Sequence, residues 1–196
     1  MPSLPDRHSL EALRAWDTPT ICNALEIVVP ARRAIGFTRR PLVACFPEMK
    51  PVVAFARTAM IRSREPHPRD RESANRIRLG YYEHIAAEPL PSLAVIQDID
   101  APDTGFGAFW GEVQTHVHLV EFGGTVTVGG MVVSPNDIIH ADRHGAVVIP
   151  PEAVGKIPEA IDLLTRREKV LIEASKQPGF SVDRLRQAYR EQDEIH

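Results

Sequence analysis

The residue types best suited to chemistry gather in one short stretch, Gly105-Phe-Gly-Ala-Phe-Trp-Gly-Glu-Val-Gln114. Its three glycines allow the backbone to approach a ligand closely. A helix that opens near Gly111 would present unpaired N–H groups, which bind carboxylates and phosphates. Glu112 would then stand at the mouth of that site, where a carboxylate can move protons. The pattern predicts an anion-binding loop, with a plain glycine-rich turn as the alternative that these residues leave open.

The elements that must position this loop have the pattern of an α/β protein. An apolar strand expected over residues 93–98 ends directly before it, and a second buried strand is expected over 52–61. Helices are expected over 10–16, 18–28, 73–87, 152–176 and 181–194, and short strands over 116–122, 125–128, 131–133, 138–141 and 146–149. Residues 30–51 read as loops with short strands. The chain is therefore predicted to form one α/β domain over 1–196, with a small barrel-like β portion.

Local signals add detail to the helices. Ser9, Thr18 and Ser181 are the expected N-caps, because their hydroxyls precede apolar periodic segments. In the helix over 73–87, the inward face is expected to carry apolar side chains at helical spacing, namely Ile77, Tyr81 and Ile85. The run of arginines and acids from Arg62 to Arg78 is better explained as a solvated loop and first helical turns than as a phosphate site.

Composition narrows the functional class. Apolar residues make up 43% and charged residues 25%, ordinary values for a globular protein. With 23 basic and 26 acidic side chains the net charge is −3, so no direct nucleic-acid partner is expected. No segment has the apolar core of a signal peptide or the length of a membrane span. Cys22 and Cys45 are too few for a disulfide framework or a Cys-only zinc site. We expect a cytoplasmic protein with no membrane partner.

Six segments, taken in order, resemble the RraA-like family. This family includes the regulator of ribonuclease activity A and the 4-hydroxy-4-methyl-2-oxoglutarate aldolases, and relatives often carry a dimethylmenaquinone methyltransferase label. The matching segments are Asp17–Leu25, Ala56–Ala59, Phe106–Val113, Val128–Met131, Pro135–Asp142 and His144–Pro150. The resemblance implies an α/β/β sandwich similar to swivelling phosphohistidine domains. It also implies homotrimers or hexamers with active sites at subunit borders.

The resemblance further implies a carbon–carbon lyase. Aldolase members use a divalent metal, Mg²⁺ or Mn²⁺, to cleave 4-hydroxy-2-oxo diacids to pyruvate, and they also decarboxylate oxaloacetate. Gly111, Glu112, Val113 and Gln114 match the substrate loop, so they are expected to bind the small 2-oxo acid. Glu112 matches the acidic position that orients a metal-bound water and is the expected catalytic residue. A divalent cation suits this chemistry, because it stabilises an enolate as a Lewis acid.

One departure from the family pattern concerns the metal. Relatives carry a later Gly-x-x-x-(Asp or Asn)-Gly-x-x-Arg-Asp motif, whose Arg binds substrate and whose Asp binds the metal. This chain instead passes from Gln114 straight into Thr115-His-Val-His118, as if an internal segment near 114–115 were missing. Such a deletion would also remove a core strand with its helix. The metal ligands therefore stay unknown, with four carboxylates as weak candidates: Asp98 and Asp100 beside the loop, and Glu168 and Glu173 as donors from a neighbour's C-terminal helix.

Two other functions remain open at this point. The missing Arg-Asp pair motivates a non-catalytic RraA-like binding protein or ribonuclease modulator. Alternating His116 and His118, followed by Glu121 and His140, motivate a cupin-like metal site, although the N-terminal half is too helical for a cupin. Hydrogen bonding at turns and strand edges is the favoured role of the histidines, His116, His118, His140 and His144.

Overall fold

The computed structural model describes residues 4–64, 69–100 and 118–196. Its larger sheet is built around β1 (Val52–Arg62), which is buried along most of its length because its sequence is almost continuously apolar. On one side β1 pairs in parallel with β2 (Ser92–Asp98). On its other side, its first half pairs antiparallel with β6 (Ile138–Asp142) and its second half with β3 (His118–Phe122). Adding β7 (Gly145–Ile149) gives the order β2-β1-β6-β7.

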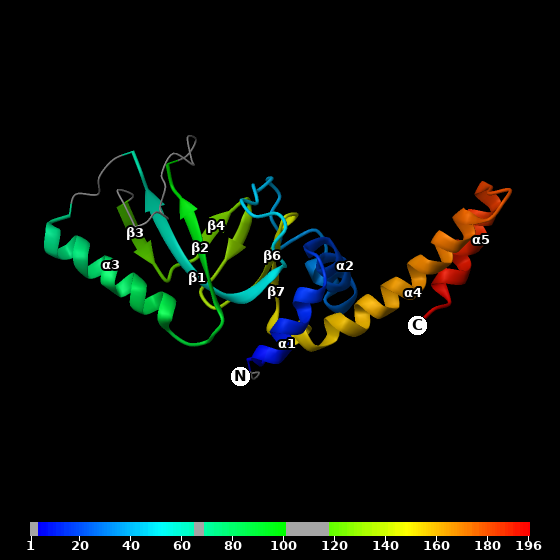
Figure 1. Ribbon diagram of the computed structural model, residues 1–196, viewed down its shortest axis with the longest axis horizontal. Helices are drawn as coiled ribbons and strands as arrows, with labels where there is room; N and C mark the ends of the chain where they lie inside the picture. The colour runs from blue at the N-terminus through cyan, green and yellow to red at the C-terminus, as the bar shows by residue number, and fades with distance from the viewer. Residues whose placement is uncertain (1–3, 65–68, 101–117) are drawn as a thin grey trace.

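The sheet lies between helices and a β-hairpin. The hairpin of β4 (Val126–Val128) and β5 (Met131–Val133) packs on one face, where Val126 and Val133 meet Val95 and Ile139. Helices α1 (Arg7–Ala12), α2 (Thr18–Val28) and α4 (Ile157–Lys176) share the other face with a second apolar cluster. These layers confirm the predicted α/β class and follow the order helix, sheet, hairpin (Figure 1). In the region predicted to be barrel-like, the hairpin forms a separate two-stranded sheet that packs against β6 and β7.

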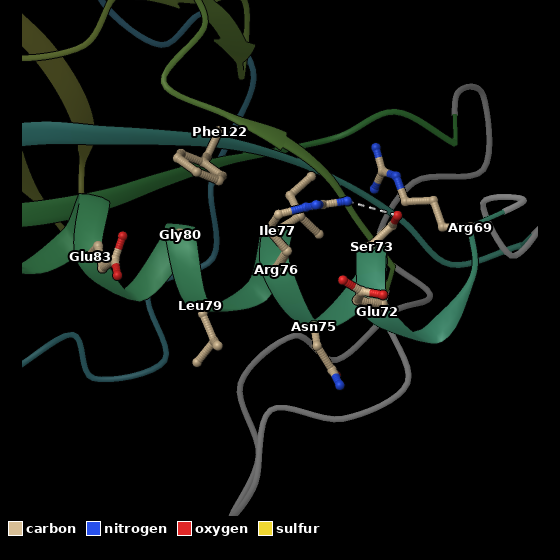
Figure 2. A pocket seen from close by; sticks show the side chains of 10 residues that line it. All are labelled: Arg69, Glu72, Ser73, Asn75, Arg76, Ile77, Leu79, Gly80, Glu83 and Phe122. Atoms are coloured by element: carbon tan, nitrogen blue, oxygen red, sulfur yellow. Dashed lines mark hydrogen bonds between the residues drawn. The ribbon is translucent and has the colours of Figure 1, made fainter.

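Helix α3 (Arg71–Ala86) covers the far end of β1. Ile77, Tyr81 and Ile85 pack against β1 and β3, as predicted from their spacing. Gly80 allows this close approach, because a Cβ atom there would lie 2.9 Å from Cζ of Phe122 (Figure 2). A groove of about 820 Å³ runs along the exposed flank of α3, with Phe122 in its lining.

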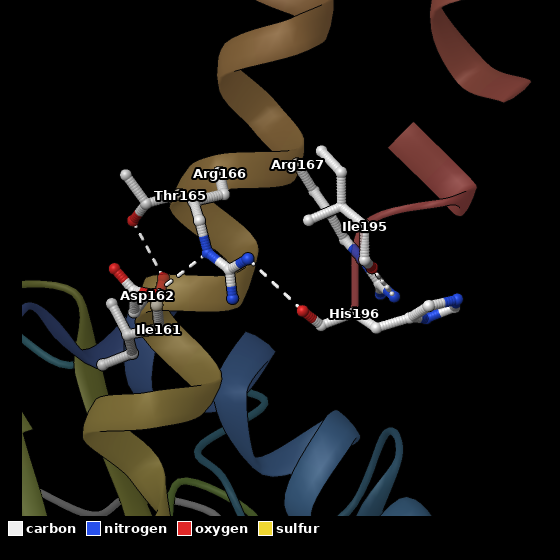
Figure 3. A network of polar contacts seen from close by, with 7 residues as sticks. All are labelled: Ile161, Asp162, Thr165, Arg166, Arg167, Ile195 and His196. Carbon is white, nitrogen blue, oxygen red and sulfur yellow. Dashed lines mark hydrogen bonds and ion pairs between the residues drawn. The ribbon is translucent and has the colours of Figure 1, made fainter. Parts of the chain in front are cut away.

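The C-terminal helices extend away from the sheet (Figure 1). After the 3₁₀ segment η3 (Pro151–Lys156), α4 runs outward and α5 (Val182–Asp193) returns along it. The last residues are tied back to α4, since the Arg167 guanidinium donates to the Ile195 carbonyl at 2.8 and 3.0 Å (Figure 3). None of the described helices combines the length and apolar composition that crossing a membrane requires.

Two predicted helix starts are wrong by one or more residues. Asp6, not Ser9, caps α1, and its carboxylate accepts from the Ser9 N–H at 2.7 Å. Asp17, not Thr18, caps α2 through the Thr20 N–H at 2.9 Å. In both places a carboxylate three residues before the N–H acts as the cap. Ser181 caps α5 as predicted.

The segment between α2 and β1 also differs from its prediction. Short strands were expected within residues 30–51. The described chain there forms the 3₁₀ turn η2 (Pro30–Arg32), with a single bridge from Phe37 to Val147 on β7.

Candidate active site at the carboxyl ends of beta1 and beta2

The parallel strands β1 and β2 end side by side, with Ile61 opposite Asp98. In α/β sheets, ligands bind beyond the carboxyl ends of parallel strands. The chain that follows, residues 101–117, carries the glycine-rich motif. Gly111, Glu112, Val113 and Gln114 lie outside the described residues, so their role as the substrate loop stays a prediction.

The structure does describe the residues on either side of segment 101–117. At its start, Asp100 is held against the residues that follow β1. At its end, His118 opens β3 and pairs with Arg62, the last residue of β1. The residues that flank the predicted substrate loop, Asp100 and His118, therefore both lie at the carboxyl end of β1.

Asp100 organises this edge. One of its oxygens, Oδ2, accepts from the N–H groups of Ser63 at 2.6 Å and Arg64 at 3.1 Å. Its other oxygen, Oδ1, lies 3.8 Å from Nε of Arg62. The Asp100 N–H in turn donates to the Asp98 carboxylate at 3.0 Å. The carboxylate thus folds the chain after β1 back against the chain after β2, in a buried position.

The polar groups at this edge carry charges of both signs, from Asp98 and Asp100 and from Arg62 and Arg64. Arg62 is partly exposed and lies 3.8 Å from Asp100, and Arg64 is exposed. The Ser63 hydroxyl is buried and has no hydrogen-bond partner in the described part of the chain. A guanidinium binds carboxylates through charge-assisted hydrogen bonds. At this edge Arg62 is the guanidinium whose position the structure gives, and it faces Asp100.

The carboxylates proposed as metal ligands are not gathered in one place. Within the described ranges, no three His, Cys, Asp or Glu side chains converge as a cation site would require. Asp98 and Asp100 lie together at the strand ends, but Asp100 is engaged by two backbone N–H groups and faces Arg62. Glu168 and Glu173 lie exposed on α4, at the other end of the molecule in Figure 1. The described residues do not by themselves fit a metal centre.

A second polar cluster lies at the start of α2, where the segments Asp17–Leu25, Pro135–Asp142 and His144–Pro150 meet. The Asp142 carboxylate accepts from the Thr18 N–H at 2.8 Å and from the His144 N–H at 2.8 Å. It therefore supplements the Asp17 cap and also closes the β6–β7 turn. Asp142 and Arg143, which superficially offer the groups of the missing motif, thus belong to a turn and a helix start.

His140 lies fully buried inside this cluster. Its Nε2 is 3.0 Å from the Trp16 carbonyl oxygen, and its Nδ1 is 3.0 Å from the Thr18 hydroxyl. Since a carbonyl only accepts, Nε2 carries the proton and Nδ1 accepts from the hydroxyl in the neutral ring. This agrees with the predicted hydrogen-bonding role and leaves His140 no free nitrogen for a metal. The cupin-like interpretation gains no support from it.

Burial lowers the pKa of His140 below its usual 6.5, although Trp16 and Asp142 oppose the shift. The unfolded chain therefore binds a proton at a higher pH than the folded chain. Stability should be constant above about pH 6.5 and fall as the pH drops below it, by at most about 1.4 kcal/mol per pH unit. Urea unfolding between pH 5 and 7.5 measures this slope. His140→Gln should flatten it, whereas the exposed control His144→Gln should keep it; an unchanged slope in His140→Gln contradicts the assignment.

Sequence reasoning missed the most connected side chain, Arg57. It lies on β1 with 1% of its surface exposed. Its guanidinium donates to Oδ1 of Asn136 at 2.5 Å and to the carbonyl oxygens of Ala87 at 2.6 Å and Pro89 at 2.7 Å. The available signal was a single arginine inside an otherwise apolar strand, a position where a charge must find partners.

Comparisons with known proteins show the fold but do not assign the chain to a family. No family model and no curated protein matches the chain. Among solved structures, an uncharacterized protein from Pseudomonas syringae pv. tomato aligns over 96% of this chain and 97% of its own, with 18% identity and a TM-score of 0.59. A structure described as novel cellulases from microbes of the gut ecosystem aligns over 86% and 88%, with 14% identity and a TM-score of 0.60. RraAS2 of Streptomyces coelicolor, described as an unusual member of the RNase ES inhibitor RraA protein family, aligns over 89% and 99%, with 15% identity and a TM-score of 0.48. The first two alignments show that this chain shares an α/β fold with proteins of widely different sequence.

Proposed function

We propose that this protein is a carbon–carbon lyase that acts on small 2-oxo acids with a divalent cation, Mg²⁺ or Mn²⁺. Its reactions would be retro-aldol cleavage of 4-hydroxy-2-oxo diacids to pyruvate and decarboxylation of oxaloacetate. One observation supports the proposal: the residues that flank the segment with the Gly-Glu motif, Asp100 and His118, both lie at the end of β1, near Arg62. Ligand sites of α/β sheets occupy this edge.

Each group of the proposed site would have a separate role. The amides of residues 111–114 would hold the substrate carboxylate, and Arg62, at the end of β1, would contribute positive charge. Glu112 would act as a general base that removes the proton of the 4-hydroxyl group as the carbon–carbon bond breaks, and as a general acid that returns a proton to the enolate carbon of pyruvate. A divalent cation would supply Lewis-acid stabilisation of the enolate. Because the described residues do not form a metal centre, we assign no ligand to it and derive no step through it.

Assembly follows from the same proposal. A trimer or hexamer would bring the α4 of one subunit to the loop of another. Glu168 and Glu173 of a neighbouring subunit would then be candidate metal ligands. Within one subunit they cannot reach the site, because α4 points away from the carboxyl edge (Figure 1). We place the protein in the cytoplasm, with no direct nucleic-acid partner.

The test is a pyruvate assay on the purified chain. Oxaloacetate and 4-hydroxy-4-methyl-2-oxoglutarate are supplied in turn, with Mg²⁺, with Mn²⁺ or with a chelator. Pyruvate is followed through lactate dehydrogenase, and the rate of the metal ion without protein is subtracted. We expect protein-dependent release with either metal and loss of that release with the chelator.

The informative negative result is folded protein, shown by circular dichroism, that releases no pyruvate from either substrate. That outcome removes the lyase proposal and favours a non-catalytic binding protein on the same fold.

A further inference from the structure

Strand β2 lies at the edge of the larger sheet, in the part of the chain that the structure describes. Between Ser92 and Gln97 its residues, Leu-Ala-Val-Ile, are apolar at both alternating sets of positions. Leu93 and Val95 pack toward the hairpin and Ile96 toward α3. Such a run is typical of a strand whose two faces are both covered, as they are here. Natural edge strands carry lysine, proline or a bulge that blocks pairing, and β2 carries none of these.

The alternation of its backbone shows which groups point outward. The Pro91 carbonyl accepts from the Phe55 N–H, and the Ile99 N–H donates to the Ile61 carbonyl, so odd-numbered residues face β1. Ser92, Ala94, Ile96 and Asp98 therefore direct their N–H and C=O groups away from the sheet. No described residue bonds to the outward groups of Ala94 or Ile96.

The other edges of the sheet, along β7 and β3, are covered by other parts of the same chain. On β7, the Ala146 carbonyl accepts from the Thr38 N–H at 2.9 Å and the Val148 N–H donates to the Gly36 carbonyl at 2.8 Å. On β3, the Arg69 guanidinium donates to the carbonyl oxygens of Leu119 and Val120. The fold thus protects two edges and leaves β2 open within the described residues.

We propose that the open edge of β2 pairs antiparallel with β2 of a second copy of this chain, across a two-fold axis at Val95. In this register Ala94 lies opposite the partner's Ile96, and Ser92 lies opposite the partner's Asp98. The two Ala94–Ile96 pairs then form four inter-strand hydrogen bonds, two on each side of the axis. No like charges face each other, because Asp98, the one charge in β2, meets a serine. Two-fold contacts of this kind are the commonest symmetric interfaces.

Proline substitution tests the ladder directly. Proline is tolerated in an edge strand where its missing N–H faces outward, so Ala94→Pro with Ile96→Pro spares the β1–β2 pairing. Sedimentation velocity should give half the wild-type mass for this double variant. The control, Ala94→Ser with Ile96→Thr, keeps both N–H groups and should keep the wild-type mass. Wild-type protein that is monomeric at 100 µM, or a mass unchanged by the prolines, overturns the proposal and points to another partner for β2 or another interface.

A cysteine variant tests the register even if the prolines prevent folding. Two-fold symmetry at Val95 makes it a non-hydrogen-bonded pair with Cα atoms about 4.5 Å apart, within disulfide range. In a background with Cys22→Ser and Cys45→Ser, mild oxidation should cross-link Val95→Cys into a covalent dimer. Leu93→Cys should not cross-link, because its two copies lie ~13 Å apart. Equal cross-linking of both variants, or of neither, excludes the proposed pairing.

Discussion

Replacing Glu112 with Gln should lower kcat/KM for pyruvate release from oxaloacetate by about 10²- to 10⁴-fold. The amide keeps the size of the side chain and its place beside the predicted amide site, but it cannot gain or lose a proton at neutral pH. General acid–base catalysis contributes this much to typical enzymes. Steady-state kinetics with subtraction of the metal-ion background measures the effect, which rests on the proposed function.

The matched control is Glu48→Gln, which removes one exposed carboxylate from the loop between α2 and β1. We expect wild-type kinetics from it. If Glu112→Gln also keeps full activity while the wild type is active, Glu112 is not the catalytic carboxylate, and the lyase proposal then needs another acid at the same edge.

Replacing Arg57 with Met should reduce the free energy of unfolding by about 4 kcal/mol. Methionine fills most of the space but donates no hydrogen bond, so the carbonyls of Ala87 and Pro89 and the Asn136 amide oxygen lose a donor. Each unsatisfied buried acceptor costs about 1–3 kcal/mol. Burial already lowers the pKa of Arg57, with Glu88 opposing, so the charge depends on these partners. Urea denaturation followed by circular dichroism gives the change.

Arg33→Met is the matched control. Arg33 pairs with Glu26 at 3.0 Å, but its side chain is 78% exposed. Exposed pairs of this kind contribute less than about 1 kcal/mol. A loss at Arg57 no larger than the loss at Arg33 would show that the loop before β2 does not depend on the guanidinium.

Local pattern identified most of the helices and strands and the inward face of α3, although not the helix starts at Asp6 and Asp17 or the lack of strands within residues 30–51. The continuous apolar run of β1 marked it as a buried strand, and the spacing of Ile77, Tyr81 and Ile85 identified the packed face of α3. These features are visible in sequence because burial on one face imposes a period of two or 3.6 residues. The glycine-rich motif was also visible, as was its position directly after a strand.

The partners of particular groups were decided only by the tertiary structure. Arg57 bonds to Asn136, 79 positions away, and Asp142 bonds to the Thr18 N–H, 124 positions away. The open edge of β2 is of the same kind, because its apolar sequence indicated burial on both faces but not which strand lies beside it. The sequence of a strand, or the type of a side chain, indicates whether it prefers burial or hydrogen bonding. Its partner depends on the tertiary fold, because the fold brings together segments that are far apart in the chain.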